Sequence, residues 1–94
     1  MLKPIFVLYD EGADLYSDPI AFESKKFAIG SYRRQIRDLY ANEDVSYDQL
    51  QDSKFVYIAD YDTDNGKFIN ISGSARLVVD STSLLEEVSE DEVQ

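Results

Sequence analysis

The strongest fold signal in this chain is Phe55-Val-Tyr-Ile-Ala-Asp-Tyr-Asp-Thr-Asp-Asn-Gly-Lys-Phe-Ile-Asn-Ile71. Aromatic and branched apolar residues fill its first half, and Asp, Asn and Gly fill its middle before apolar residues return. This order predicts two strands joined by a turn. Asn65-Gly66 offers the positive φ angles that a two-residue hairpin turn requires. We therefore predict a β-hairpin over residues 55–71.

The acids of the same turn raise the question of a calcium site, but their spacing does not fit one. An EF-hand loop needs carboxylates at positions 1, 3 and 5, Gly at 6 and Glu at 12. Counted from Asp60, position 6 is Asn65 and position 12 is Ile71. We interpret these acids as solvated turn residues that keep the hairpin end from pairing with another sheet, and we predict no metal site.

The remaining elements follow from hydrophobic periodicity and from the turn residues between them. Residues 5–9 form an apolar run typical of a buried strand, and residues 20–22 predict a short extended piece. Residues 47–51 suggest a turn or a single helical turn, and residues 75–79 predict a last strand. The expected fold is α+β: a small antiparallel sheet of about four strands, including the 55–71 hairpin, packed against one main helix.

That main helix is expected over residues 24–41, with Ser24 as its N-cap. Its apolar residues fall within an arc of roughly 120°, which is the width of a core-facing stripe. The stripe consists of Ala28, Ile29, Tyr32, Ile36, Leu39 and Tyr40. Gly30 lies off the stripe and weakens the helix by about 1 kcal/mol.

Composition excludes several classes of function. The chain has no Cys and no His, so it lacks thiolate chemistry, the usual general base and the commonest metal ligand. It shows no glycine-rich phosphate loop, and no pair of carboxylates has a spacing that implies a pocket. We expect no enzyme and no cofactor. Apolar runs too short for a signal peptide or a membrane span predict no membrane contact and a cytoplasmic location.

The net charge of −10 is distributed unevenly along the 94 residues. Six of the 19 acids lie within residues 80–94, which contain no base. We therefore predict a single domain over residues 1–79, followed by a flexible acidic tail over 80–94 that folding does not require. The overall charge disfavours simple nucleic-acid binding, because phosphates need cationic neutralisation.

Positive charge gathers on the expected helix, which holds five of the nine bases. Four of them lie beside the apolar stripe and form what we call the basic arc: Lys26, Arg33, Arg34 and Arg37. The arc is a candidate contact surface for an acidic partner segment or for phosphates. The alternative is that it is only the solvated flank of an amphipathic helix. Aromatic residues of the hairpin, such as Tyr57 and Phe68, suggest base stacking less strongly than they suggest a core.

Four short segments together form a recognisable pattern: Val7-Leu-Tyr-Asp10, Asp18-Pro-Ile-Ala-Phe22, Lys26-Phe-Ala-Ile-Gly30 and the stretch from Phe55 to Ile69. This pattern resembles the small nonstructural protein of gokushovirus-type microviruses, which are single-stranded DNA phages. The resemblance covers residues 5–72 and departs from the family pattern at Gly30, where Arg is expected. It implies an accessory role in viral single-stranded DNA replication or packaging in the host cytoplasm, without established catalytic residues.

Three functional hypotheses follow. In the first, the chain is a phage accessory protein that binds a viral or host protein, with weak single-stranded DNA contact as a second option. In the second, its negative charge mimics DNA and inhibits a host DNA-binding protein. In the third, it is a small scaffolding component, for which a homo-oligomer is an option.

Overall fold

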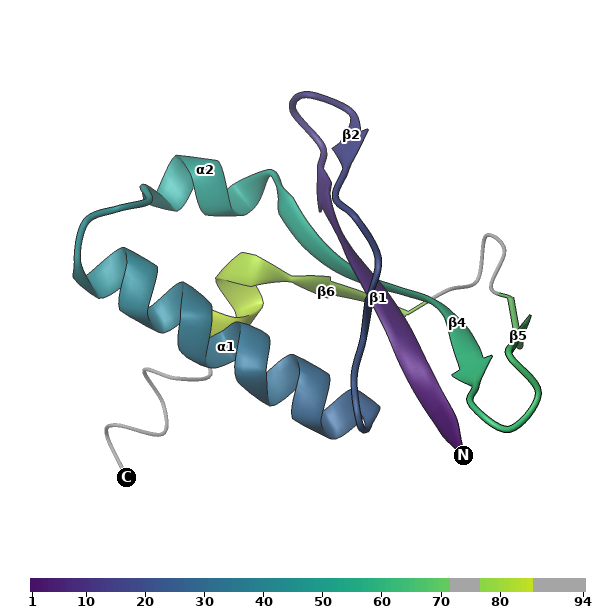
Figure 1. Ribbon diagram of the computed structural model, residues 1–94. Helices are drawn as coiled ribbons and strands as arrows, with labels where there is room; N and C mark the ends of the chain where they lie inside the picture. The colour runs from purple at the N-terminus through teal and green to yellow at the C-terminus, as the bar shows by residue number, and fades with distance from the viewer. Residues whose placement is uncertain (72–76, 86–94) are drawn as a thin grey trace.

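The computed structural model describes residues 1–71 and 77–85 and confirms the predicted α+β class. Its elements in chain order are β1 (Leu2–Asp10), β2 (Leu15–Tyr16), β3 (Ile20–Ala21), α1 (Lys25–Ala41), α2 (Tyr47–Gln51), β4 (Ser53–Asp62), β5 (Lys67–Ile69) and β6 (Val78–Asp80). Residues 81–85 add a helical turn after β6. Figure 1 shows α1 lying along one side of the sheet, with α2 leading from α1 into β4.

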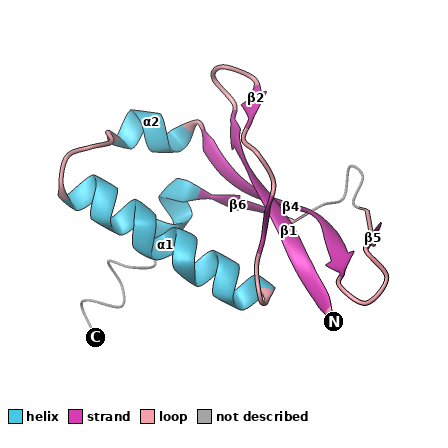
Figure 2. Cartoon of the chain, in the orientation of Figure 1, coloured by secondary structure: helices cyan, strands magenta, loops and turns pink. Residues whose placement is uncertain are grey.

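The sheet is built around the long antiparallel pair β1 and β4 (Figure 2). The short strands β2 and β3 pair in succession with the free edge of β1, and β5 and β6 do the same with the free edge of β4. The register of β1 against β4 shifts between Ile5 and Phe6, which leaves Ile58 as an extra residue in β4. A bulge of this kind bends its strand and increases the local twist, and the sheet accordingly curls.

The helix α1 forms where the sequence predicts it and starts at its predicted cap. Ser24 is extended, and its hydroxyl accepts a hydrogen bond from the Phe27 amide at 3.0 Å. This bond satisfies one of the amides that the first helical turn leaves without an intrahelical partner. Ala28, Tyr32 and Ile36, spaced four residues apart, are buried against the sheet. The predicted stripe is therefore correct in its first three turns.

The core joins this stripe to aromatic residues of the two long strands. Phe6 and Phe55 stack with their ring centroids 4.4 Å apart, and Tyr32 of α1 stacks on Phe55 at the same distance. Offset ring pairs of this kind add to the free energy gained by burying their area. Because these rings are fully used in packing, the face of the sheet under α1 is a structural core.

The packed core extends beyond Val79, the last residue of the predicted domain. Leu84 is only 2 % exposed and belongs to the same cluster as Ile36 and Phe55. Ser81 is completely buried, and its hydroxyl lies 2.7 Å from the Tyr32 hydroxyl. The segment 81–85 therefore docks against α1. The remainder of the predicted tail, residues 86–94, and residues 75–76 of the predicted strand 75–79 lie outside the described residues, whereas Val78 and Val79 form β6 together with Asp80.

The hairpin itself is present, but the predicted two-residue turn is wrong. Asp62 pairs with Lys67, so residues 63–66 form the loop, and Gly66 is its one residue with positive φ, at 67°. The reason lies in Asp62, whose carboxylate accepts hydrogen bonds from the Asp64 amide and from the Asn65 side chain. Such local bonds from an Asp side chain favour a wider turn.

Candidate functional site

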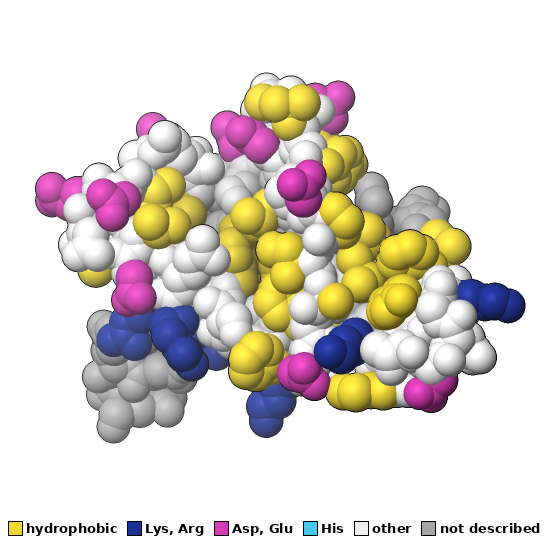
Figure 3. Space-filling model, viewed as in Figure 1, with side chains coloured by type: hydrophobic (Ala, Val, Ile, Leu, Met, Phe, Trp, Pro, Cys, Tyr) yellow, Lys and Arg dark blue, Asp and Glu magenta, His cyan; other side chains and the backbone are white. Residues whose placement is uncertain are grey.

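The basic arc is a strip along one flank of α1, as the sequence predicts. Lys26, Arg34 and Arg37 are exposed, whereas Arg33 is half-buried. Figure 3 shows Lys and Arg side chains gathered over α1. Arg33 and Arg37 already take part in interactions within the molecule. Lys26 and Arg34 are therefore the members best suited to test the arc without disturbing the fold.

Gly30 lies within the same strip and leaves room beside it. A Cβ atom added at Gly30 would meet nothing within 4 Å. A longer side chain at this position would thus extend from α1 between the bases of neighbouring turns. The geometry makes Gly30 a position at which the charge of the arc can be increased.

The aromatic residues of the hairpin do not form an open stacking surface. Phe55 and Tyr57 are buried at 4 % and 7 % exposure. The ammonium group of Lys25 lies 4.2 Å from the centre of the Tyr57 ring, so a cation already occupies one ring face. Phe68 is exposed and tilts against Tyr61 at a centroid distance of 5.5 Å. Only this last pair offers ring surface to solvent.

The acids Asp62 and Asp64 of the hairpin turn make hydrogen bonds and an ion pair that hold the turn in place. Hydrogen bonds from Asn65 and from the Asp64 amide lower the pKa of Asp62 from its ordinary value. Asp64 pairs with the chain's amino group at 2.8 Å, which ties β1 to the hairpin. Among residues 1–71 and 77–85, no three acidic side chains come together in a way that would hold a metal ion.

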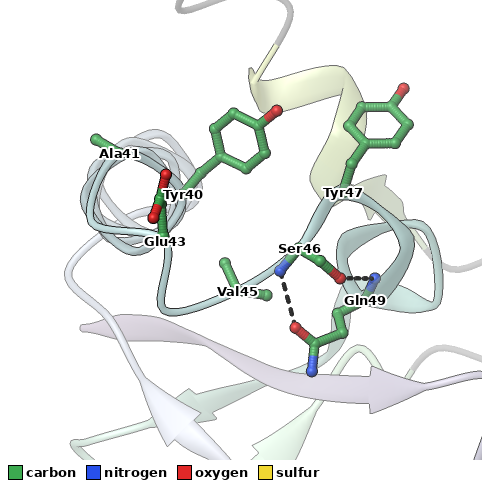
Figure 4. Close-up of a pocket in the computed structure, with 7 residues that line it drawn as sticks. All are labelled: Tyr40, Ala41, Glu43, Val45, Ser46, Tyr47 and Gln49. Carbon is green, nitrogen blue, oxygen red and sulfur yellow. Dashed lines mark hydrogen bonds between the residues drawn. The ribbon is translucent and has the colours of Figure 1, made fainter.

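The structure also has a groove at the junction of α1 and α2, which was not predicted from the sequence. It is open to solvent, has a volume of about 630 Å³ and is lined by Tyr40, Ala41, Glu43, Val45, Ser46, Tyr47 and Gln49. Figure 4 shows Tyr40 and Tyr47 projecting on either side of it, with both hydroxyls pointing the same way. Val45 packs against the core from this loop. We call this surface the tyrosine groove.

Local hydrogen bonds fix both walls of the tyrosine groove. On the α1 side, the Glu43 amide donates to the Tyr40 carbonyl and the Asp44 amide donates to the Leu39 carbonyl. This is the Schellman pattern, which closes a helix by placing one residue in the left-handed conformation. Glu43 is that residue, with φ at 61°.

On the α2 side, a reciprocal capping box holds the backbone. The Ser46 hydroxyl accepts from the Gln49 amide, and the Gln49 side chain accepts from the Ser46 amide, as the dashed lines in Figure 4 show. Ser46-x-x-Gln49 is a recognisable helix-start signal. This signal in the sequence indicates the start of α2, which forms the second wall of the groove.

Comparison with known proteins adds no identity to this geometry. No family model, curated protein or solved structure gives a significant match to the chain. Among the helices of residues 1–71 and 77–85, none has the length and apolar character needed to cross a membrane.

Proposed function

We propose that this protein acts by binding, without catalysis, as a nonstructural accessory protein of a single-stranded DNA phage. Its contact surface is the basic arc, and its partner is a viral or host protein that presents an acidic segment in the host cytoplasm. The phage setting rests on the sequence resemblance. The observation that carries the binding surface is a strip of exposed bases on a protein whose net charge is −10.

The physical argument concerns the local field of α1. A protein with 19 acids and nine bases repels acidic partners on average. A strip of four bases on one helix flank creates a local positive potential, which orients an incoming acidic segment and favours one docking face over the others. The same net charge weakens contact with phosphates elsewhere on the surface. An acidic protein segment therefore suits the arc better than a long nucleic acid does.

A second candidate function is inhibition of a host DNA-binding protein by charge mimicry. The observation that favours it is the exposure of Asp10, Glu11, Asp14 and Asp18 on and after the β1–β2 hairpin. In that case the partner carries a DNA-binding surface, and the hairpin acids form the contact. Loss of binding would then follow neutralisation of the hairpin and not reversal of the arc.

The experiment is a pull-down from phage-infected cells, with and without nuclease. The bait proteins are the native chain and a variant that carries Lys26→Glu and Arg34→Glu. A second variant, Lys67→Glu, reverses the charge of an exposed base away from α1. We expect the first variant to lose a partner that the native chain retains after nuclease treatment. Loss of the partner on nuclease treatment would instead identify a nucleic acid as the ligand.

A further inference from the structure

We propose that the tyrosine groove binds an arginine side chain presented by a basic segment of a partner protein. This site is separate from the basic arc and has the opposite electrostatic character. The inference does not depend on the proposed function, because it rests on other residues and on a ligand of opposite charge.

The first step of the argument concerns the aromatic walls. Tyr40 and Tyr47 are both 41 % exposed, although tyrosine rings of this size add much to stability when buried. Both residues line an open groove, and Figure 4 shows them projecting in the same direction, one from α1 and one from α2. Ring faces carry partial negative charge and attract cations placed over them. A planar guanidinium group stacks on such rings better than an ammonium group does.

The second step concerns the charge around the groove. Glu43 lines it, and no Lys or Arg is among its lining residues. Asp44 and Asp48 are exposed in the adjoining loop and in the first turn of α2. The carboxyl end of α1, which carries the negative pole of the helix dipole, has no basic residue in its last turn. Figure 3 shows Asp and Glu side chains around the junction of α1 and α2.

These charges decide what kind of ligand the groove accepts. A phosphate or carboxylate in the groove would meet Glu43 without a compensating cation among the lining residues. The nearest base on α1 is Arg37, one helical turn before Tyr40, and it does not line the groove. An arginine side chain satisfies both features, because it stacks on the rings while it donates two hydrogen bonds to the Glu43 carboxylate.

The third step concerns the backbone of Glu43. It occupies the left-handed position that closes α1, where glycine is the usual residue. A glutamate there makes the helix end less favourable than a glycine would. The sequence thus places a carboxylate at the groove at some cost to stability.

Peptide titrations followed by NMR of the tyrosine ring signals test the proposal. The probes are a short glycine-flanked peptide with one arginine and its counterpart with citrulline, which has the same shape without the charge. We expect the arginine peptide to shift the signals of Tyr40 and Tyr47, and the citrulline peptide to leave them unchanged. Equal responses to both peptides, or a response to a glutamate peptide at these rings, would overturn the proposal.

Substitutions then separate the groove from the general negative charge of the protein. We expect Tyr47→Leu and Glu43→Gln each to weaken arginine binding by about three- to tenfold. Glu23→Gln removes the same charge just before the start of α1, at the opposite end of this 17-residue helix from Tyr40, and should leave the affinity unchanged. Equal losses in Glu43→Gln and Glu23→Gln would reduce the effect to net charge and contradict a site. The variant Lys26→Glu with Arg34→Glu should keep the ring response to arginine, which distinguishes this site from the basic arc.

Glu43→Gly separates a role of Glu43 in arginine binding from a role in closing the helix. Glycine suits the left-handed backbone at this position, so we expect a higher melting temperature together with weaker arginine binding. A variant that gains stability and keeps full affinity for arginine would show that the carboxylate is no part of the site.

Discussion

Gly66 is the residue on which the hairpin loop closes. Its φ of 67° lies in the left-handed region, and its amide donates to the Asp62 carbonyl at 2.8 Å. Asn65 and Gly66 predict a turn at the correct place, but the sequence could not show that Asp62 would widen it. That difference arises because one carboxylate accepts two local hydrogen bonds, an outcome that depends on side-chain geometry and not on residue type alone.

Gly66→Val should lower the free energy of unfolding by about 1–3 kcal/mol, because a β-branched residue is strained at positive φ. Urea denaturation measures this change. Gly30→Ala is the matched control, since α1 is regular there and an added Cβ meets nothing within 4 Å. It should raise the free energy of unfolding by about 0.5–1 kcal/mol. Equal effects of the two substitutions would contradict the assigned role of Gly66.

The side chain of Tyr9 makes the stability of the fold depend on pH. Its hydroxyl donates to the Asp14 carboxylate at 2.7 Å, and this bond, with partial burial and nearby acids, raises the pKa of Tyr9 to about 12 from an ordinary 10.0. Because the folded-state pKa is the higher one, the bond stabilises the fold fully below the ordinary pKa. Its contribution is lost as the pH rises through the folded pKa.

NMR titration of ring-labelled tyrosine tests this assignment. Tyr9 should ionise at about pH 12, above the ordinary tyrosine pKa of 10.0. Asp14→Asn suits the left-handed backbone of that residue, whose φ is 54°, and removes the anionic acceptor. It should bring the pKa of Tyr9 back toward its ordinary value. An unchanged pKa would show that the Asp14 carboxylate does not cause the shift.

The segment after β6, residues 81–85, differs most from the sequence-based prediction, which ended the folded domain at residue 79. Leu84 packs with Ile36 of α1, and Ser81 joins Tyr32 and Ser53 in a buried hydrogen-bond network. The capping box Ser83-Leu-Leu-Glu86 predicts a short helix with Leu84, Leu85 and Val88 on one face, yet the many acids of residues 80–94 favoured a dispensable tail. Composition averaged over that window concealed that Leu84 is buried in the core and that Leu85 packs against it.

Leu84→Ala should destabilise the fold by about 2–4 kcal/mol through the cavity that it leaves. A chain that ends at residue 85 should keep nearly native stability, whereas one that ends at residue 79 should lose the contribution of Leu84 and the bonds of Ser81. Thermal unfolding followed by circular dichroism compares the three proteins. Equal stability of the chains ending at 79 and 85 would contradict the docking of this segment.

The long elements were predictable, and the short ones were predictable only in part. Periodicity located α1 and its cap, and apolar runs located β1 and β4, because each buries one face in the common core. The strand β2 has two exposed residues and carries no such signal. Tyr40 continues the apolar stripe of α1 in the sequence, yet it is 41 % exposed and lines the groove. Periodicity identifies which face of a helix is apolar, but it does not show at which residue the elements packed against that face end.

The candidate contact surfaces depend on where charge lies on the molecule more than on its net charge of −10. The basic arc runs along α1 from Lys26 to Arg37, whereas the acidic tyrosine groove lies at the carboxyl end of the same helix. The arc was predictable because its residues share one helix. The groove was not, because its two walls come from different helices that are brought together by a loop. On the two proposals made above, these surfaces of opposite sign bind two partners of opposite charge.

Gly30 allows the central claim to be tested by gain as well as by loss of binding. Gly30→Arg adds a fifth base to the arc in open space, and Gly30→Ala controls for the improved helix. The measurement is the amount of nuclease-resistant partner recovered from infected cells by Gly30→Arg, Gly30→Ala and the variant Lys26→Glu with Arg34→Glu. We expect recovery above that of the native chain for Gly30→Arg, native recovery for Gly30→Ala and loss of the partner for the reversed variant. Equal recovery by all three folded variants would contradict the claim that the basic arc is the contact surface.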